Sequence, residues 1–438
     1  MIQLKVFLTL ISIFFLTISC ASDKTDLDWQ KQLNGHNLAS NDQSYCYTDE
    51  SNKVVGSNID MRIRLASVSK LITTLWAVEE LGVHHKFKTK LFIKDNNLHI
   101  EGSSDPFLGN EKMFFLLSQL NDLGYSQFNN ITFDRNVIIN PSAQLASDEY
   151  PEMSAQKISS YINNYFNTAN WSKDFKNEYK VIARSSNAGR INKMVSFSAK
   201  SISYSPNNPF ENDPNARMLT LSSPDLFKYL KEMNIRSNNY VAETIFRKLG
   251  STNSFQQFLE TKFGITTDQV FFFTGSGLPA TLNGLRKDNY ATCSIILSLI
   301  TKLKASVENQ FLELENVVAV PGSDGGTFRN RIFPADFKNS FVAKTGTLMH
   351  TSTLAGAMNT QNGFSFFGIF NQTTDITGAK AVQNSMVSSI MLDMGGPKSF
   401  DYKVEDFYTY NEENVKKLET PFITDESSDF VTYENNLY

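Results

Sequence analysis

The chain has 438 residues, enough for a large core and for more than one domain. Hydrophobic residues make up 41% and charged residues 20%, which indicates a folded globular protein and excludes a disordered one. The formal net charge of −4 gives no reason to expect nucleic acid as a partner.

The N-terminus is typical of a secretory signal peptide. Lys5 precedes an apolar run over 6–18 that is too short to span a membrane, and small residues surround Cys20. The stretch LTISC resembles a bacterial lipobox with Cys20 as the lipidated residue, although Thr17 stands where such motifs carry leucine. The alternative is ordinary cleavage after Ala21. We favour the lipoprotein, and either site predicts an exported, periplasmic protein.

The next elements are a tether, a hairpin and a helix. The polar segment 21–40 is expected to be a tether. Two extended runs within 44–65 flank a turn at 49–52, which predicts a β-hairpin. Apolar residues then recur at three and four positions from Leu71 to Leu81, and Gly82 follows, which predicts an amphipathic helix with a glycine stop.

The remaining pattern alternates strands and helices. Strand-like runs with one helix are expected within 86–142, and the pattern weakens over 151–214. Two buried strands are expected over 341–359 and 363–371. Helices are expected within 221–250, 255–263, 289–303 and 379–392. From 395 to 438 the chain is acidic and is expected to form a tail.

Two cysteines remain after the signal peptide, Cys46 and Cys293. They can pair in an oxidising compartment or lie separately in the core, and a sequence separation of 247 (293−46) does not decide between the two. The five histidines are scattered, and no Cys/His cluster has the spacing of metal ligands, so no metal site is expected.

Ser67-Val68-Ser69-Lys70 opens the first helix and is a candidate catalytic pair. Helix positions i and i+3 share a face, so a lysine amine can reach the serine hydroxyl, which needs a base to become a nucleophile. Burial or another cation can lower a lysine pKa enough to supply neutral amine. The pattern is weak alone, because Ser154-Ala155-Gln156-Lys157 shares it and either can be a solvated helix start.

Two further short motifs have the same ambiguity. Lys344-Thr345-Gly346 lies in an expected strand, where it can bind a carboxylate or simply be an edge strand with a glycine. Ser237-Asn238-Asn239 directly precedes a helix, where it can face a cleft or act as an N-cap. The Ser-x-Asn pattern also occurs at Ser185, Ser205 and Ser251.

The three motifs in this order are the signature of penicillin-binding proteins and serine β-lactamases. The surrounding residues resemble the class C low-molecular-mass penicillin-binding proteins, the D-alanyl-D-alanine carboxypeptidase/endopeptidase family. The resemblance runs with gaps from about Ser44 to Leu392. It includes the motif regions and the segments 100–106, 237–243, 275–278, 322–325 and 354–356.

Three departures accompany the resemblance. Thr274 replaces an acidic residue of the family, 279–285 is an apparent insertion, and about 142–214 matches poorly. The implied fold is an α/β (α+β) fold of the serine β-lactamase/penicillin-binding transpeptidase type, with an antiparallel sheet flanked by helices. The implied organisation is a signal peptide (1–20), a tether (21–40), a peptidase domain (41–95 and 215–394), an inserted accessory domain (96–214) and an acidic tail (395–438).

The resemblance also implies roles. Ser67 is the nucleophile, Lys70 the general base and Ser237 a proton relay to the leaving amine. Asn239 holds the substrate amide, and Lys344 with Thr345 binds the terminal carboxylate. The backbone N–H groups of Ser67 and Thr347 form the oxyanion hole. Peptidoglycan stem peptides are the implied substrates and β-lactams the implied inhibitors, with no metal or organic cofactor. The alternatives are a β-lactamase or esterase on the same scaffold and a non-catalytic peptidoglycan-binding lipoprotein.

Overall fold

A computed structural model describes residues 20–145, 153–186 and 190–410. The expected signal peptide lies outside the described residues, as does the side chain of Cys20. The chain divides into two compact units. Over the described residues, the first is built from 20–86, 142–145 and 224–407, and the second from 87–141, 153–186, 190–223 and 408–410.

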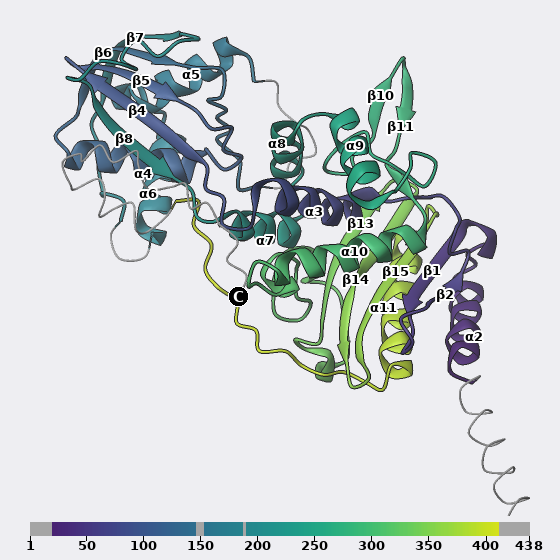
Figure 1. The fold of residues 1–438 in the computed structure, drawn as a ribbon. Helices are drawn as coiled ribbons and strands as arrows, with labels where there is room; N and C mark the ends of the chain where they lie inside the picture. Colours follow the sequence, from purple (N-terminus) through teal and green to yellow (C-terminus); the bar gives the residue numbers. More distant parts are fainter. Residues whose placement is uncertain (1–19, 146–152, 187–189, 411–438) are drawn as a thin grey trace, which may run out of the picture. The chain divides into compact units, whose positions relative to one another are not determined.

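The first unit is organised around an antiparallel five-stranded sheet in the order β13-β14-β15-β1-β2 (Figure 1). Its strands are β1 (Gln43–Thr48), β2 (Val54–Ser57), β13 (Phe341–Leu348), β14 (Thr351–Thr360) and β15 (Gly363–Asn371). Strands β1 and β2 form the expected hairpin, and β15 is the strand expected over 363–371. The single strand expected over 341–359 is wrong, because a turn at 349–350 divides this run into the antiparallel pair β13 and β14. Strand β13, which carries Lys344, lies at an edge of the sheet.

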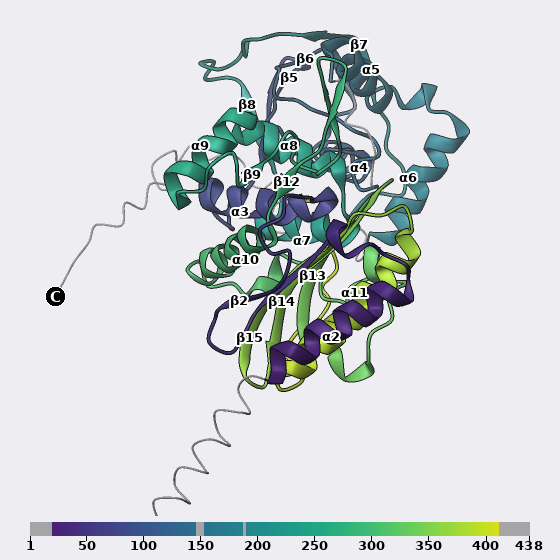
Figure 2. The same ribbon diagram turned by 90° about the vertical axis from the view of Figure 1, so that its right-hand side faces the viewer.

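Two helices cover one face of this sheet, α2 (Cys20–Gly35) and α11 (Ile376–Asp393), and they pack side by side (Figure 2). Trp29 and Leu33 of α2 are buried with the side chains of α11 and of alternate strand residues. The expectation of a tether over 21–40 is therefore wrong. Trp29 and Leu33 are spaced by four residues, so a narrow apolar stripe on a polar helix is enough to dock it.

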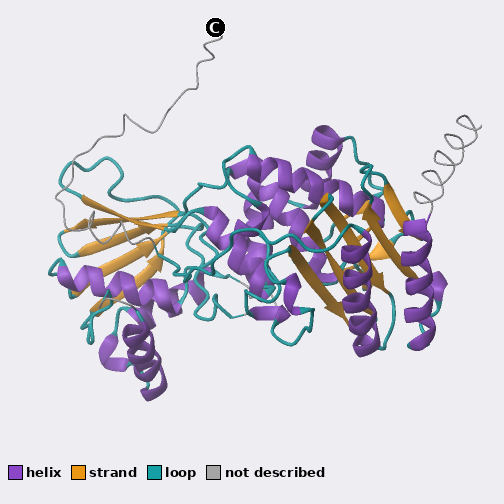
Figure 3. Cartoon of the chain, turned by 90° about the horizontal axis from the view of Figure 1, so that it is seen from below, coloured by secondary structure: helices purple, strands orange, loops and turns teal. Residues whose placement is uncertain are grey.

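The opposite face carries α10 (Cys293–Glu308), which packs against α3 (Ser69–Leu81). Cys46 of β1 and Cys293 of α10 form a disulfide, with their Cα atoms 6.0 Å apart. The unit also contains α7 (Leu226–Arg236), α8 (Asn239–Leu249) and α9 (Thr252–Phe263). The sheet thus lies between helical layers, as Figure 3 shows and as the sequence indicates.

Short strands complete the first unit. A small sheet has the order β3-β12-β9, with β3 (Ile63–Arg64), β12 (Tyr290–Ala291) and β9 (Val270–Phe271). The apparent insertion at 279–285 forms most of a hairpin of β10 (Ala280–Leu282) and β11 (Leu285–Lys287), which projects from the unit (Figure 1).

The second unit has a mixed five-stranded sheet in the order β7-β6-β5-β4-β8. Its strands are β4 (Lys88–Lys94), β5 (Asn97–Glu101), β6 (Gln127–Phe133), β7 (Ser198–Tyr204) and β8 (Arg217–Ser222). Its helices are α4 (Asn110–Asp122), α5 (Ala155–Tyr165) and α6 (Lys173–Ser185). Aromatic side chains around Phe114 fill much of its core. The unit begins at Phe87, before the expected insert 96–214, and ends its main part at Ser223, after it, while the segment that follows Pro141 belongs to the first unit.

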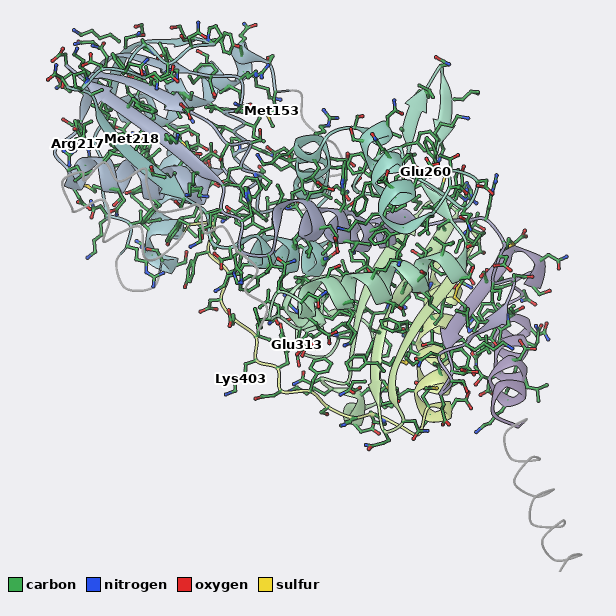
Figure 4. The ribbon with its side chains drawn as sticks, in the orientation of Figure 1. Met153, Arg217, Met218, Glu260, Glu313 and Lys403 are labelled. Atoms are coloured by element: carbon green, nitrogen blue, oxygen red, sulfur yellow. A yellow bond between two sulfur atoms is a disulfide. The ribbon has the colours of Figure 1, made fainter. Side chains whose placement is uncertain are left out.

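The chain after Gly395 is not a free tail over its described part. The Lys398 N–H donates a hydrogen bond to the Asn359 carbonyl, and the Tyr402 hydroxyl donates one to the Asp324 carboxylate at 2.6 Å. Glu313 and Lys403, labelled in Figure 4, line one cavity beside this segment. Residues 411–438 of the expected tail lie outside the described residues.

Candidate active site

The two serines of the first motif occupy different environments. Ser67 is partly exposed in the 3-10 turn η2 (Ala66–Val68), whereas Ser69 at the start of α3 is buried and accepts a hydrogen bond from Asn289 at 3.0 Å. Lys70 is 0% exposed, and its Nζ donates to Ser67 Oγ at 3.0 Å. The hydroxyl that can be both activated and reached is therefore that of Ser67.

The turn that carries Ser67 is held in an unusual conformation. Ala66 has φ +47°, a left-handed conformation that costs a residue with a side chain about 1–3 kcal/mol. The backbone of Gly277 packs directly against Ala66, so that a Cβ added to Gly277 would lie 1.9 Å from the Ala66 carbonyl oxygen. Since the surrounding loops fix this turn, the direction of the Ser67 side chain is determined before any ligand binds.

Strand β13 brings the third motif to the same turn. Lys344 and Gly346 share a face of the strand, because alternate residues of a strand point the same way. A Cβ on Gly346 would lie 2.9 Å from the backbone nitrogen of Ser67, so glycine permits this close approach. Strand β14 supports it, since Thr353 Oγ1 donates to the Leu65 carbonyl at 2.8 Å.

The β13 side chains differ in exposure. Lys344 is 0% exposed, and its Nζ donates to the Thr345 carbonyl at 2.9 Å. Thr345 is also buried, whereas Thr347 is exposed. The backbone nitrogens of Ser67 and Thr347 thus belong to two adjacent segments that meet at Gly346.

The middle motif joins two helices. Ser237 ends α7 in a left-handed conformation with φ +56° and is partly exposed. Asn238 is the N-cap of α8 and accepts a hydrogen bond from Val241 at 3.0 Å. Asn239 begins α8, and its Oδ1 accepts a hydrogen bond from Lys70 at 2.7 Å. Asn238 therefore has the capping role, while Asn239 contacts the candidate base.

Burial sets the electrostatics of the two lysines. It lowers the pKa of Lys70 to about 7, against the opposing effect of the Glu243 carboxylate. Burial also lowers the pKa of Lys344 well below its usual value, and the charge of Lys70 adds to this effect. Near neutral pH, a substantial fraction of Lys70 is the neutral amine that a general base requires.

Sequence reasoning missed one direct contact of Lys70 and the residues behind it. The Ser276 carbonyl accepts a hydrogen bond from Lys70 at 2.8 Å, and Glu243 accepts one from the Ser276 N–H at 2.8 Å. The segments 275–278 and 237–243 contain these residues, but in the sequence they indicate only a family resemblance. A contact to a backbone carbonyl carries no residue-type signal.

The second Ser-x-x-Lys is structural. Ser154 is the N-cap of α5 and accepts a hydrogen bond from the Lys157 backbone N–H at 3.3 Å. Within 20–145, 153–186 and 190–410, no group of three or more His, Cys, Asp or Glu side chains is arranged to hold a metal ion. No helix in this part of the chain is both long and apolar enough to cross a bilayer.

A family model matches almost the whole of this architecture. The model of the D-Ala-D-Ala carboxypeptidase 3 (S13) family matches residues 31–208 and 206–391. The chain belongs to this family. It is therefore a serine peptidase of the low-molecular-mass penicillin-binding type, as the motifs indicate. No curated protein matches the chain.

Several solved structures resemble this S13 member. Bd3459, a predatory peptidoglycan endopeptidase from Bdellovibrio bacteriovorus, is 27% identical, with 85% of this chain and 98% of that chain covered and a TM-score of 0.77. Bd0816, a predatory endopeptidase of the same organism, is 28% identical, with 82% and 95% covered and a TM-score of 0.72. Penicillin binding protein 4 (dacB) from Haemophilus influenzae shares the fold at 17% identity, with 83% and 99% covered and a TM-score of 0.56.

Proposed function

We propose that this S13 member is an exported serine D-Ala-D-Ala carboxypeptidase and endopeptidase. It acts on peptidoglycan stem peptides through an acyl-enzyme on Ser67. The observation that carries the proposal is the contact of 3.0 Å between Ser67 Oγ and the amine of Lys70, whose pKa burial lowers to about 7. This arrangement supplies a nucleophile and a matched base at neutral pH.

Acylation follows from this geometry. The neutral amine of Lys70 removes the proton of Ser67 Oγ as the oxygen attacks the carbonyl carbon of the substrate peptide bond. The N–H groups of Ser67 and Thr347 stabilise the resulting oxyanion, and loss of one such donor typically costs about 10²- to 10³-fold in rate. The peptide C–N bond then breaks, while the new ester C–O bond remains.

The other motif residues bind and protonate. Ser237 relays a proton to the leaving amine, and Asn239 holds the substrate amide. Lys344 and Thr345 bind the terminal carboxylate, whose negative charge favours the ammonium form of Lys344. Water then attacks the ester and regenerates the Ser67 hydroxyl.

The relatives favour an endopeptidase activity beside the carboxypeptidase activity. Bd3459 and Bd0816 are endopeptidases, and Bd3459 acts on peptidoglycan. A structure of Bd3459 is acylated by penicillin G, which supports β-lactams as covalent inhibitors of the present chain. We therefore expect the enzyme both to trim stem peptides and to cut cross-links.

Export has its own support. Peptidoglycan lies outside the cytoplasm, and the disulfide of Cys46 and Cys293 is typical of an oxidising compartment. The sequence of residues 1–20 supplies a signal peptide pattern, and Cys20 is our candidate for lipid anchoring in the periplasm.

Product analysis tests the proposal. The purified protein should release D-Ala from a muramyl pentapeptide and convert cross-linked muropeptide dimers to monomers, and Ser67→Ala should do neither. Rapid turnover of a cephalosporin without D-Ala release would instead show a β-lactamase or esterase. A folded protein that neither acylates nor cleaves would show a non-catalytic peptidoglycan-binding lipoprotein.

A further inference from the structure

The amine of Lys70 needs an orientation as well as a lowered pKa. Its Nζ contacts Ser67 Oγ at 3.0 Å, Asn239 Oδ1 at 2.7 Å and the Ser276 carbonyl oxygen at 2.8 Å. A neutral amine has two hydrogens and one lone pair. When both hydrogens go to the two carbonyl-type acceptors, the lone pair points at the Ser67 hydroxyl. The Ser276 carbonyl is thus one of two groups that aim the base.

Glu243 anchors the loop directly before this carbonyl. Its Oε1 accepts the Ser276 N–H at 2.8 Å, and its Oε2 accepts the Gly275 N–H at 3.3 Å. The side chain is only 8% exposed and lies one helical turn after Asn239 on α8, so one helix face positions both acceptors of the Lys70 amine.

The 275–277 loop, which carries Ser276, has no room to move toward α8. A Cβ on Gly275 would lie 2.7 Å from the Ala242 carbonyl oxygen and 2.4 Å from Phe246 Cβ. Close packing from one side and two hydrogen bonds to one buried carboxylate fix the peptide between Gly275 and Ser276. The Ser276 carbonyl belongs to the next peptide, which is confined in turn where Gly277 packs against the backbone of Ala66.

We propose that Glu243 is a positioning residue, which aims the Lys70 amine at Ser67 by anchoring the loop from which the Ser276 carbonyl projects. The inference rests on the proposed function and adds a residue to it. Glu243 contacts neither Ser67 nor the substrate groups in this scheme, so its effect passes through Lys70.

The charges around Lys70 give the inference a specific signature. Glu243 faces it from α8 and Lys344 from β13, while its direct contacts on η2, α8 and the 275–277 loop are uncharged. The Glu243 carboxylate favours protonated Lys70. Removal of that charge alone therefore lowers the pKa of Lys70 and moves the rise of activity to lower pH.

Two variants separate charge from position. Glu243→Gln keeps the shape but removes the charge and one acceptor, because its NH₂ group cannot accept the second N–H. Glu243→Asp keeps the charge but shortens the reach. The matched control is Glu232→Gln on α7, since Glu232 is also 8% exposed and pairs with Arg236 instead.

The measurement is the second-order rate of acylation by a fluorescent penicillin between pH 5 and 9. We expect both Glu243 variants to acylate about 10- to 100-fold more slowly at their optimum, the loss typical of one charged hydrogen bond. The acid limb, the part of the profile where the acylation rate rises as Lys70 loses its proton, should move to lower pH in Glu243→Gln. It should stay at the wild-type pH in Glu243→Asp. Glu232→Gln should match the wild type in both respects.

Unchanged rates in folded Glu243 variants would overturn the inference. A slower rate with an unmoved acid limb in Glu243→Gln would also overturn it, since that result describes general loosening of the site. If Glu243→Gln does not fold, the rate of Glu243→Asp decides. Failure of the wild type itself to be acylated would instead contradict the proposed function, so the two failures are distinguishable.

Discussion

The pH dependence of acylation gives a quantitative test of the Lys70 environment. With a pKa of about 7, Lys70 is neutral in about 9% of molecules at pH 6 and in about 91% at pH 8. A lysine with the ordinary pKa of about 10.4 would be neutral in only about 0.04% of molecules at pH 7. Because the base acts in its neutral form, the rate should rise with pH, about tenfold between pH 6 and pH 8, and then level.

Stopped-flow or gel-based kinetics with a fluorescent penicillin measure this rate. The second-order constant reports the pKa of the free enzyme. Circular dichroism at each pH confirms that the protein stays folded. A flat profile from pH 5.5 to 8.5 would refute Lys70 as the base. A rate that continues to rise about tenfold per pH unit up to pH 10 would refute its lowered pKa.

Three further predictions test the framework around the site. Cys46→Ala with Cys293→Ala should lower the free energy of unfolding by about 2–5 kcal/mol in denaturant titrations without slowing acylation at 25 °C, and an unchanged midpoint would contradict this. Trp29→Ala should lower the free energy of unfolding by about 3–5 kcal/mol, since Trp29 is 0% exposed. A decrease below about 0.5 kcal/mol would instead show that the segment 21–40 is an undocked tether. Gly346→Ala should slow acylation about 100-fold by displacing the strand from the nucleophile, while Gly35→Ala, with open space around it, should not; equal rates would show that the close approach is unimportant.

The elements around the reaction centre were predictable because their signals are local. The apolar spacing from Leu71 to Leu81 and the stop at Gly82 define α3, which ends as expected with Gly82 at φ +77°. The apolar residues Phe341, Val342 and Ala343 directly before Lys344 indicate the buried strand β13. The order of the three motifs along the chain predicts that Ser67, Asn239 and Lys344 share one site.

Other features depend on partners distant in sequence. The sequence of α2 predicts a tether because Trp29 and Leu33 are almost its whole apolar stripe, and only the packing against α11 shows that two such residues suffice. The pairing of Cys46 with Cys293 could not be derived from their spacing. The Ser276 contact to Lys70 uses a backbone carbonyl, which every residue has.

The most direct test of the account is the site of the covalent penicillin adduct. The protein is incubated with penicillin G, digested and analysed by tandem mass spectrometry. We expect one adduct, on Ser67, which is lost in Ser67→Ala and retained in Ser154→Ala. An adduct on Ser69 or Ser154, or its persistence in folded Ser67→Ala, would contradict the assignment of the nucleophile.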